Sequence, residues 1–305
     1  MMLGIKGYSL TTGWGNGLQS LPDNACTAAD NRRILPLPTP VRHDDRLRRA
    51  TRECVLAVNA VENALANSNM THDELAGPRT ALIYASASSY AAANWAFLND
   101  DQGAYFPYTA PSAVPGEVTI QYGISGPYLS LLSGANAGVE ALWHAATLLS
   151  TDQCDRALIL SVETFAECET LYTTGRWLLG MPLVETAICL IIEPHMALAN
   201  IGYQAGNGTP EYLIKTFLEP PTEAVLCLCT PTTNDGRHTA QRLQACWPHL
   251  STIITNERTG TCLASSALIG LLLSLTTCTS ENVLLMSRWW DAWAVLRWPA
   301  QPQTQ

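Results

Sequence analysis

The chain has 305 residues, enough for one large α/β unit or for about two domains of ~150 residues, and so for a sizeable buried core. Apolar residues make up 47% and charged residues 14%, a balance that excludes a disordered chain and is typical of a globular protein with extensive buried or partner-covered surface. The formal net charge of −9 argues against general nucleic-acid binding, because Lys and Arg contacts to phosphates supply most of that affinity.

Apolar runs alternate with amphipathic stretches along the chain, which is the pattern of an α/β protein. A helix is predicted over 45–66, where apolar residues recur at helical spacing; four arginines cluster near its start, Arg46, Arg48, Arg49 and Arg52. Strands are predicted at 81–84, 157–160 and 187–192, and a helix at 138–149. The apolar stretch 263–275 contains three serines and is shorter than the ~20 residues of a membrane span, so we expect a buried helix and no membrane span.

Two parts of the chain resemble each other. The segments that start at Ser133 and at Thr259 both read as small-residue turn, helix, loop and strand, and 158–161 then falls opposite 284–287. A looser pairing sets 80–89 against 224–233. Two similar α/β halves packed face to face are therefore predicted within one compact unit, an N-terminal half over 1–198 and a shorter C-terminal half over 199–305. Chance similarity between two generic buried helices is the alternative for either pairing taken alone.

A family resemblance rests on the segment 105–161. Tyr-Gly at 122–123, Gly-Pro at 126–127 and spaced small residues at 133–138 precede a helix and a strand. This segment resembles the nucleophile region of β-ketoacyl-acyl-carrier-protein synthases, and the resemblance continues more weakly at 3–17, 184–193 and 232–235. It implies an α/β thiolase-like fold, in which two similar halves form the layers α-β-α-β-α. That fold agrees with the internal repeat.

The catalytic residues of that family are absent at the matching positions. The family performs a decarboxylative Claisen condensation, in which a Cys at a helix N-terminus carries the acyl chain and two His residues assist decarboxylation. The resemblance places Ala135 at the Cys position, and Cys227 and Thr261 at the two His positions. It therefore implies no catalytic residue in this chain, and we expect neither a cofactor nor a metal.

Within the family, the subunit that lacks the Cys is the chain-length factor, which pairs with a catalytic ketosynthase. The resemblance thus implies a non-catalytic, chain-length-factor-like subunit that forms a heterodimer, or a dimer of heterodimers, with an active β-ketoacyl synthase. It would shape the acyl tunnel in type II polyketide or polyene biosynthesis. The compact segment at 164–183 resembles the non-catalytic subunit of aryl polyene pigment systems.

The other expected partner is an acyl carrier protein. Because such carriers are acidic and this chain is acidic too, we expect transient contact mainly through the catalytic partner. The arginine cluster at 42–52 is the exception to test, with a solvated helix face as its alternative. The N-terminus lacks a charged segment followed by an apolar one, so free thiols and a cytoplasmic location are expected.

The resemblance also marks residues of the acyl tunnel and the subunit interface. Ser88 and two aromatic residues would border the acyl pocket, and 126–133 would be the strand by which subunits pair. Core packing is the alternative for the aromatic residues and leucines. The candidates are Ser88, Tyr105, Phe106, Leu129, Leu131, Ser133 and Asn136.

Two other functions stay open. The first is a thiolase-fold acyltransferase or condensing enzyme whose nucleophile has moved to Cys229 or Cys262, of which Cys262 comes closer to a helix start. The second is a decarboxylating priming subunit that would use Asn136 and Thr261. A zinc site that combines 227–229 with 246–249 is disfavoured by its spacing.

Overall fold

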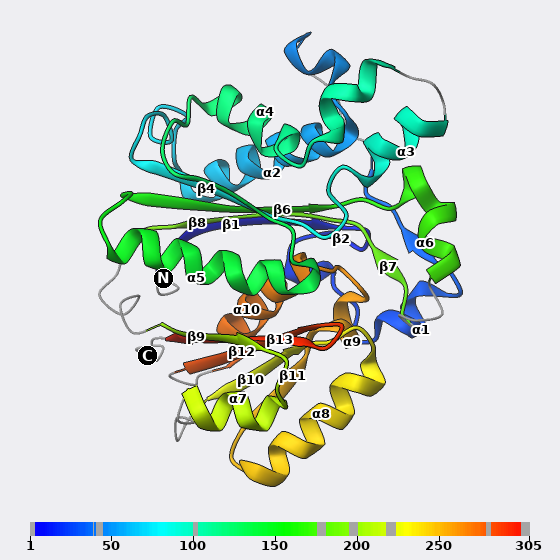
Figure 1. Ribbon diagram of the computed structural model, residues 1–305, viewed down its shortest axis with the longest axis vertical. Coiled ribbons are helices and arrows are strands. Elements are labelled where there is room, and N and C mark those ends of the chain that lie inside the picture. The colour runs from blue at the N-terminus through cyan, green and yellow to red at the C-terminus, as the bar shows by residue number, and fades with distance from the viewer. Residues whose placement is uncertain are drawn as a thin grey trace.

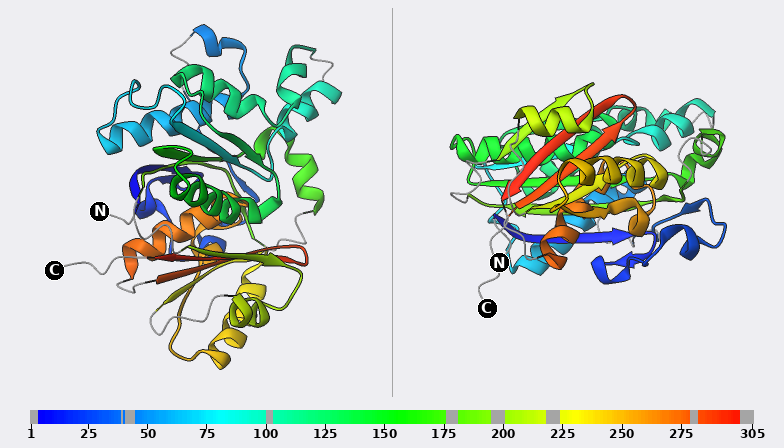
Figure 2. Two further views of the ribbon diagram at one scale, coloured as in Figure 1. Left: turned by 60° about the vertical axis from the view of Figure 1, so that its left-hand side comes forward. Right: turned by 90° about the horizontal axis from the view of Figure 1, so that it is seen from below.

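The strands form two mixed sheets that lie face to face, with helices between them and on both outer faces (Figure 1). The computed structural model describes residues 4–38, 40, 45–99, 103–175, 181–194, 201–217, 224–278 and 282–299. The layers follow the order α-β-α-β-α, which is also visible in the left-hand view of Figure 2. The predicted five-layer α/β fold is therefore confirmed.

The first sheet has six strands. Their order is β2 (Gly15–Asn16), β1 (Ile5–Thr12), β8 (Thr186–Ile192), β6 (Arg156–Glu163), β4 (Thr80–Ala85) and β5 (Tyr128–Leu131). β8 is antiparallel to both neighbours, whereas β4 is parallel to β5 and to β6. β4 and β8 are buried along their whole length because helices cover both faces of the sheet, which explains their unbroken apolar runs.

The second sheet has five strands and repeats the topology of the first. Their order is β11 (Ser251–Ile254), β10 (Val225–Cys229), β12 (Asn282–Trp289), β13 (Ala292–Pro299) and β9 (Gly202–Gly206). With the two-residue β2 set aside, both sheets place their strands in the chain order third, second, fourth, fifth, first. The fifth is antiparallel to its neighbours in both. The predicted repeat is confirmed, since 158–161 and 284–287 lie in the two fourth strands.

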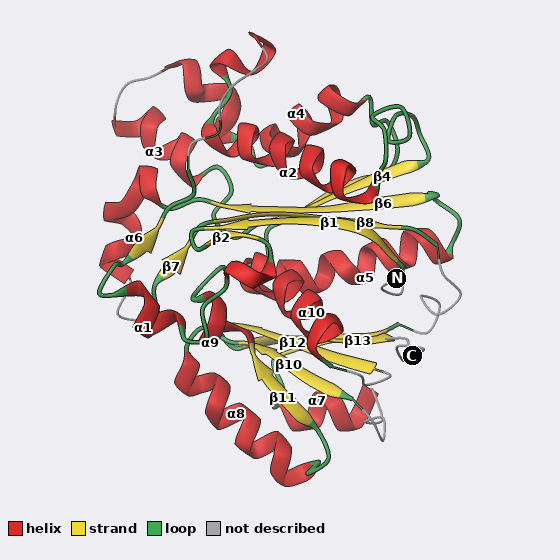
Figure 3. Ribbon diagram, turned by 180° about the vertical axis from the view of Figure 1, so that it is seen from behind, coloured by secondary structure: helices red, strands yellow, loops and turns green. Residues whose placement is uncertain are grey.

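Helices separate and cover the sheets (Figure 3). The outer face of the first sheet is covered by α2 (Arg52–Ser68) and α4 (Ala113–Tyr122), and that of the second by α7 (Pro210–Phe217) and α8 (Thr233–Cys246). The shorter elements are α1 (Ala25–Ala29), α3 (Ala91–Asn99), α6 (Glu169–Gly175), α9 (Thr255–Thr259), the strand pair β3 (Ile34–Leu35) and β7 (Leu183–Val184), and the 3-10 turns η1 (Leu18–Ser20), η2 (Asp45–Arg49), η3 (Gly103–Thr109), η4 (Gly134–Asn136) and η5 (Ala166–Cys168).

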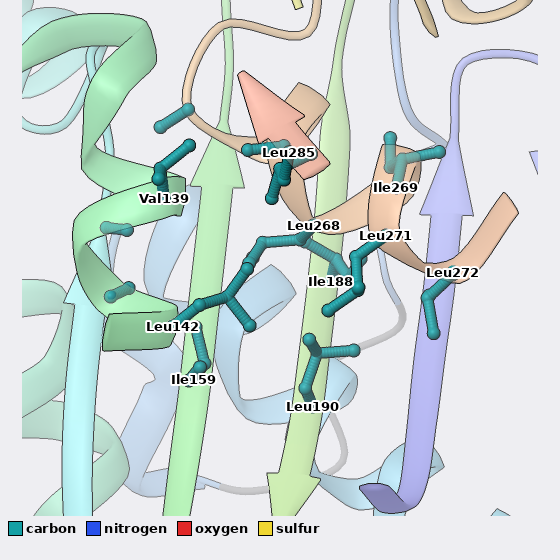
Figure 4. Packing of buried hydrophobic residues seen from close by; sticks show 14 of the residues in the cluster. Val139, Leu142, Ile159, Ile188, Leu190, Leu268, Ile269, Leu271, Leu272 and Leu285 are labelled. Atoms are coloured by element: carbon teal, nitrogen blue, oxygen red, sulfur yellow. The ribbon is translucent and has the colours of Figure 1, made fainter. Parts of the chain in front are cut away.

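The central layer consists of α5 (Ala137–Ser150) and α10 (Ser265–Thr277), which pack against each other and against both sheets (Figure 4). Their side chains share one apolar core, in which Leu142 and Leu268 lie between the sheets. The helices approach closely at Gly138, where an added Cβ would lie 2.2 Å from the carbonyl oxygen of Ala264. The predicted buried helix at 263–275 is thus confirmed as α10.

Two features differ from the sequence prediction or lie beyond it. The helix predicted over 45–66 is interrupted, because Thr51 has an extended backbone (φ −66°, ψ 161°) and α2 starts only at Arg52, after η2. The predicted boundary near Ala199 lies outside the described residues, so the division into 1–198 and 199–305 stays a prediction.

Candidate functional site

Residues from four parts of the chain meet at the end of α5 that follows η4. Ala135, Thr261 and Cys229 line the same small pocket, which has a volume of about 10 Å³. That is room for about one water molecule. The complete lining is Ala135, Cys229, Thr230, Pro231, Asn256, Thr261, Leu263, Ser266 and Trp289. The fold therefore joins the predicted positions Ala135 and Thr261 at a pocket that is almost filled.

Trp289 fills the space on one side of this pocket. It is the last residue of β12. Its indole nitrogen would lie 2.3 Å from a Cβ added to Gly134, so the indole leaves no room for a side chain there. Gly134 also has a φ of 66°, which glycine adopts without strain. Two hydrogen bonds tie η4 to the β12–β13 hairpin: the Ser287 hydroxyl donates to the carbonyl of Ala135 at 2.9 Å, and the Asn136 amide donates to that of Ala292 at 3.2 Å.

The chemistry of the lining is that of a polar but uncharged pocket. Its polar side chains are three hydroxyls, one thiol, one carboxamide and one indole, and none of the nine lining residues carries a carboxylate, an imidazole or an amine. The Asn256 Oδ1 and Thr261 Oγ1 atoms are buried and have no hydrogen-bond partner within the described residues. The pocket therefore holds hydrogen-bonding groups but no acid or base that could move a proton at neutral pH.

Neither predicted thiol is arranged as a nucleophile. A hydrogen bond with Cys227 and burial together raise the pKa of Cys229 well above its usual range. Cys262 has no exposed surface, and burial raises the pKa of its thiol to about 12. Both groups are thiols at neutral pH, whereas a reactive cysteine needs a partly exposed site that favours the thiolate.

Cys227, the predicted position of the first family His, does not line this pocket. Its Sγ lies 3.1 Å from the Thr255 hydroxyl and packs over Gly270. The sequence prediction placed the first His position by counting back from residues 234–235, on the assumption that these two residues lie in a loop. Both lie instead in the first turn of α8, where the Thr232 hydroxyl accepts a hydrogen bond from the Asp235 N–H. Cys229, Thr230 and Pro231 are the residues of this segment that reach the pocket.

The predicted tunnel and interface residues fall into two groups. Ser88 and Asn136 are buried, and the Ser88 hydroxyl donates to the Glu163 carboxylate at 2.5 Å rather than lining the pocket. The others lie along β5, η3 and the start of η4: Tyr105, Phe106, Leu129, Leu131 and Ser133. The seven predicted residues therefore do not line one common cavity in the described part of the chain.

The second group belongs to an open edge of the first sheet. In the described part of the chain β5 pairs with β4 alone, so its other edge is unpaired. Large apolar side chains are exposed on β5 and directly after it, and on α3, η3 and α4: Leu98 (75%), Phe106 (64%), Ile120 (68%), Tyr128 (39%) and Leu132 (40%). The Tyr128 hydroxyl donates to the Ser112 carbonyl at the start of α4, and Phe97 and Phe106 join α3 to η3. An unpaired strand beside exposed apolar side chains is typical of a protein–protein contact. We call these five residues and β5 the β5 face.

The predicted arginine cluster is engaged within the chain. The Arg46 guanidinium donates to Glu117 and to Gln121, and Arg52 donates to Glu185 at 2.6 Å and to Glu167 at 2.8 Å. The side chain of Arg49 lies outside the described residues. Two of the four arginines therefore neutralise this chain's own carboxylates.

Sequence reasoning missed three buried carboxyl groups near the ends of the first sheet, those of Glu53, Glu163 and Glu185. Glu163 ends the apolar strand β6, and Glu185 directly precedes the apolar strand β8. An acid at the end of an otherwise apolar run is the signal that could have identified both. Among the described residues, no three His, Cys, Asp or Glu side chains are grouped to hold a metal, and no helix has the length and apolar character of a membrane span.

Comparisons with known proteins agree with this geometry. Residues 39–182 match the family model for the N-terminal domain of beta-ketoacyl synthases. No match was found among curated proteins. A solved type II PKS acyl-carrier protein in complex with its ketosynthase contains a chain with a TM-score of 0.75 and 17% identity, over 98% of this chain and 99% of that chain.

Two further solved structures are similar over their whole length. The ishigamide ketosynthase/chain length factor has a TM-score of 0.72 and 15% identity, over 99% of this chain and 100% of that chain. A beta-ketoacyl synthase from Burkholderia phymatum STM815 has a TM-score of 0.74 and 14% identity, over 98% of this chain and 100% of that chain. At these identities the similarity shows the fold, which is the α/β ketosynthase, or thiolase-like, fold.

Proposed function

We propose that this chain, which has the ketosynthase fold and matches the beta-ketoacyl synthase N-terminal domain over residues 39–182, is a non-catalytic subunit of a condensing complex. In this proposal it forms a heterodimer with an active β-ketoacyl synthase and completes that enzyme's acyl tunnel. Like a chain-length factor, the chain itself catalyses no bond formation.

The observation that carries the proposal is the pocket around Ala135. A methyl group stands at the position of the family nucleophile, so no acyl thioester can form there. The pocket has a volume of about 10 Å³, and Trp289 occupies the adjoining space. An acyl chain needs far more room, because ligand pockets span roughly 300–1,000 Å³. Both the missing nucleophile and the filled pocket support a role other than catalysis.

The β5 face supports the subunit role. Its apolar side chains are exposed and its strand edge is unpaired, whereas a partner strand would satisfy the free backbone groups and cover the apolar area. Tyr105 and Phe106 of η3 lie in the region that the partner would cover, and we assign them the role of a tunnel gate. The carrier protein would dock mainly on the partner, because Arg46 and Arg52 are bound to acids of this chain.

By their descriptions, one solved structure with this fold is a type II PKS acyl-carrier protein in complex with its ketosynthase, and another is a ketosynthase/chain length factor. They support type II polyketide or polyene biosynthesis as the setting of the proposal. The aryl polyene type and the cytoplasmic location stay predictions. The relocated-nucleophile alternative has no support from the thiols, since the pKa of each is raised: that of Cys229 by its hydrogen bond with Cys227 and by burial, and that of Cys262 by burial.

The experiment is size-exclusion chromatography with light scattering on the chain alone and on the chain co-expressed with a ketosynthase encoded beside it. We expect a stable one-to-one complex, which Leu132→Lys abolishes by placing a charge on the β5 face. Tyr212→Lys is the matched control, because Tyr212 is 59% exposed on α7 of the second half. A homogeneous homodimer of this chain that forms no complex with the co-expressed ketosynthase would refute the proposal.

A further inference from the structure

A second, larger cavity lies along β1, on the opposite side of the first sheet from β5. It has a volume of about 690 Å³, within the range of roughly 300–1,000 Å³ that is typical of ligand pockets. Its lining comes from β1, from the turn through β2 into η1, and from α2: Ile5, Lys6, Gly7, Tyr8, Ser9, Leu10, Thr11, Asn16, Gly17, Gln19, Asn63, Ala66 and Asn67. We call this cavity the β1 groove.

The part of β1 in this groove has no strand partner on the groove side. β2 pairs with Thr11 and Thr12 alone, and within the described residues no other strand lies beside this edge of β1. The other edge pairs with β8 in antiparallel register. In such a pair, alternate residues direct both the N–H and the C=O to the partner strand, and the residues between them direct both groups away. The groove side of β1 is therefore a free strand edge.

Two hydrogen bonds identify the residues whose backbone faces the groove. The Tyr8 carbonyl accepts from the Asn67 carboxamide at 3.0 Å, and the Leu10 carbonyl accepts from the Gly17 N–H at 2.8 Å. Tyr8 and Leu10 therefore direct their backbone away from β8, and their N–H groups point the same way. Within the described residues these two N–H groups have no acceptor on the groove side. The Asn67 amide thus takes the place of one donor of a neighbouring strand.

The side chains around the groove also suit a peptide backbone. Four of them are carboxamides, which carry the same C=O acceptor and N–H donors as a peptide group: Asn16, Gln19, Asn63 and Asn67. Lys6 is the only charged lining residue, so no carboxylate lines the groove to repel the carbonyl groups of an entering chain. An extended polypeptide is therefore the ligand whose hydrogen-bonding groups match those of the groove.

We propose that the β1 groove binds an extended segment of a partner protein, which adds a strand to the first sheet beside β1. The N–H groups of Tyr8 and Leu10 donate to carbonyl groups of the segment, and the carboxamides bond its remaining polar groups. The free edge has room for about five residues at ~3.3 Å each. Lys6 and the shift of register between Ile5 and Gly7 disfavour pairing with an arbitrary strand, so the walls of the groove select the segment.

This site does not depend on the proposed subunit role. β1 and β5 lie on opposite sides of the first sheet, so a ketosynthase bound to the β5 face would leave the β1 groove open. The segment would come from a further protein, and its binding should be the same in the chain alone and in the complex. Failure of either proposal therefore leaves the other intact.

Selection from a phage library of random short peptides tests the proposal on the purified protein, in the assembly in which it is isolated. Phage that bind Ala66→Tyr are removed first, because a tyrosine at this exposed position of α2 would fill the groove. The selected peptides should bind the matched control Ala245→Tyr as tightly as the parent, and Ala66→Tyr at least about tenfold more weakly. Ala245 is an exposed alanine of α8, in the second half. Urea denaturation first establishes that both variants are folded.

Backbone methylation of a selected peptide then tests whether it binds as a strand. N-methyl groups on alternate residues fall either on the N–H groups that face β1 or on those that face away from it. We expect one set to lower the affinity at least about tenfold more than the other, because it removes the hydrogen bonds to β1. Two results would overturn the proposal: no peptide remains after subtraction with Ala66→Tyr, or both methylated sets lower the affinity equally.

Discussion

Trp289 determines what the pocket at Ala135 can accept. Its indole occupies the volume beside Gly134, and the hairpin that carries it is hydrogen-bonded to η4. The pocket beside it has a volume of about 10 Å³, which is too small for an acyl chain. A large aromatic side chain at the position is compatible with the fold and incompatible with that substrate.

This arrangement gives a prediction for an introduced thiol. Ala135→Cys should react slowly with a bulky maleimide, because Trp289 fills the adjoining space, and adding Trp289→Ala should accelerate the reaction at least about tenfold. Peptide mapping by mass spectrometry separates the new thiol from the exposed Cys26 and Cys246. Equal labelling rates in the single and the double variant would mean that Trp289 does not close the pocket.

Cys262 provides the test of the relocated nucleophile. Its thiol is buried with a raised pKa, so Cys262→Ala should leave turnover of the condensing complex unchanged while lowering stability by about 1 kcal/mol. The measurements are product formation and the midpoint of urea denaturation. Loss of activity in a variant that is folded and still bound to its partner would make Cys262 catalytic.

The resemblance places Ala135 at the nucleophile position and Thr261 at the second His position, and both residues line one pocket. Their correspondence to the catalytic positions of the family stays a prediction. Cys227 and Cys229 lie two residues apart on β10, and both thiols contact the Thr255 hydroxyl, so they share one face of the strand. Cys229, at the end of the strand, lines the pocket and Cys227 does not, and residues 234–235 lie in the first turn of α8 rather than in a loop, so counting back from them could not identify the residue at the pocket. The hydrogen bonds of Glu53 and Glu163 could not be predicted from the sequence, since they join α2, β6 and the segment after β4 through long-range contacts.

At the level of elements, the close approach of α5 to the start of α10 gives a direct test of the packing. An added Cβ at Gly138 would lie 2.2 Å from the Ala264 carbonyl and 3.0 Å from the Ala267 Cβ, and backbone atoms cannot simply move away. Overpacking of this kind costs about 1–3 kcal/mol or more, which exceeds the gain of about 1 kcal/mol that alanine brings to a helix.

Gly138→Ala should therefore lower the free energy of unfolding by roughly 1–2 kcal/mol. The matched control is Gly116→Ala in α4, where nothing lies within 4 Å of the new Cβ, and which should raise stability by up to about 1 kcal/mol. Urea denaturation measures both. A stabilised Gly138→Ala would show that the helices can separate without cost, against the close contact described here.

Elements with a strong local signal were predicted well. The apolar runs of β4, β6 and β8 and the helices α5 and α10 appear at their expected places, because burial on both faces leaves uninterrupted apolar sequence. The helix over 45–66 was predicted as continuous because apolar spacing carries across Thr51, whereas a single extended residue interrupts it. Such a break depends on the tertiary contacts of Arg52, which local periodicity does not contain.

At the scale of the whole molecule, the two halves share one core through α5 and α10, and their buried acids make stability depend on pH. Burial raises the pKa of Glu53 and of Glu163 from 4.5 to about 7, so between these values the folded protein holds protons that the unfolded chain has released. The free energy of unfolding therefore falls as the pH rises from about 4.5 to 7 and changes little above. The exposed Glu74 and Asp155 have lowered pKa values and act in the opposite direction, only at lower pH.

We predict a lower midpoint of urea denaturation at pH 8 than at pH 5, by at most about 3 kcal/mol in unfolding free energy for each carboxyl group. Glu53→Gln should reduce the difference because it removes one of the two titrating groups. A protein whose stability rises steadily from pH 5 to pH 8 would mean that both carboxyl groups are ionised in the fold with ordinary pKa values.

The measurement that tests the subunit role most directly is native mass spectrometry of the chain co-expressed with its ketosynthase, after incubation with an acyl thioester substrate. It reads the stoichiometry and the acylated subunit in one spectrum. We predict a complex with equal numbers of the two subunits in which the acyl mass is carried by the ketosynthase alone. An acyl mass on this chain, or a chain that never joins the complex, would contradict the account.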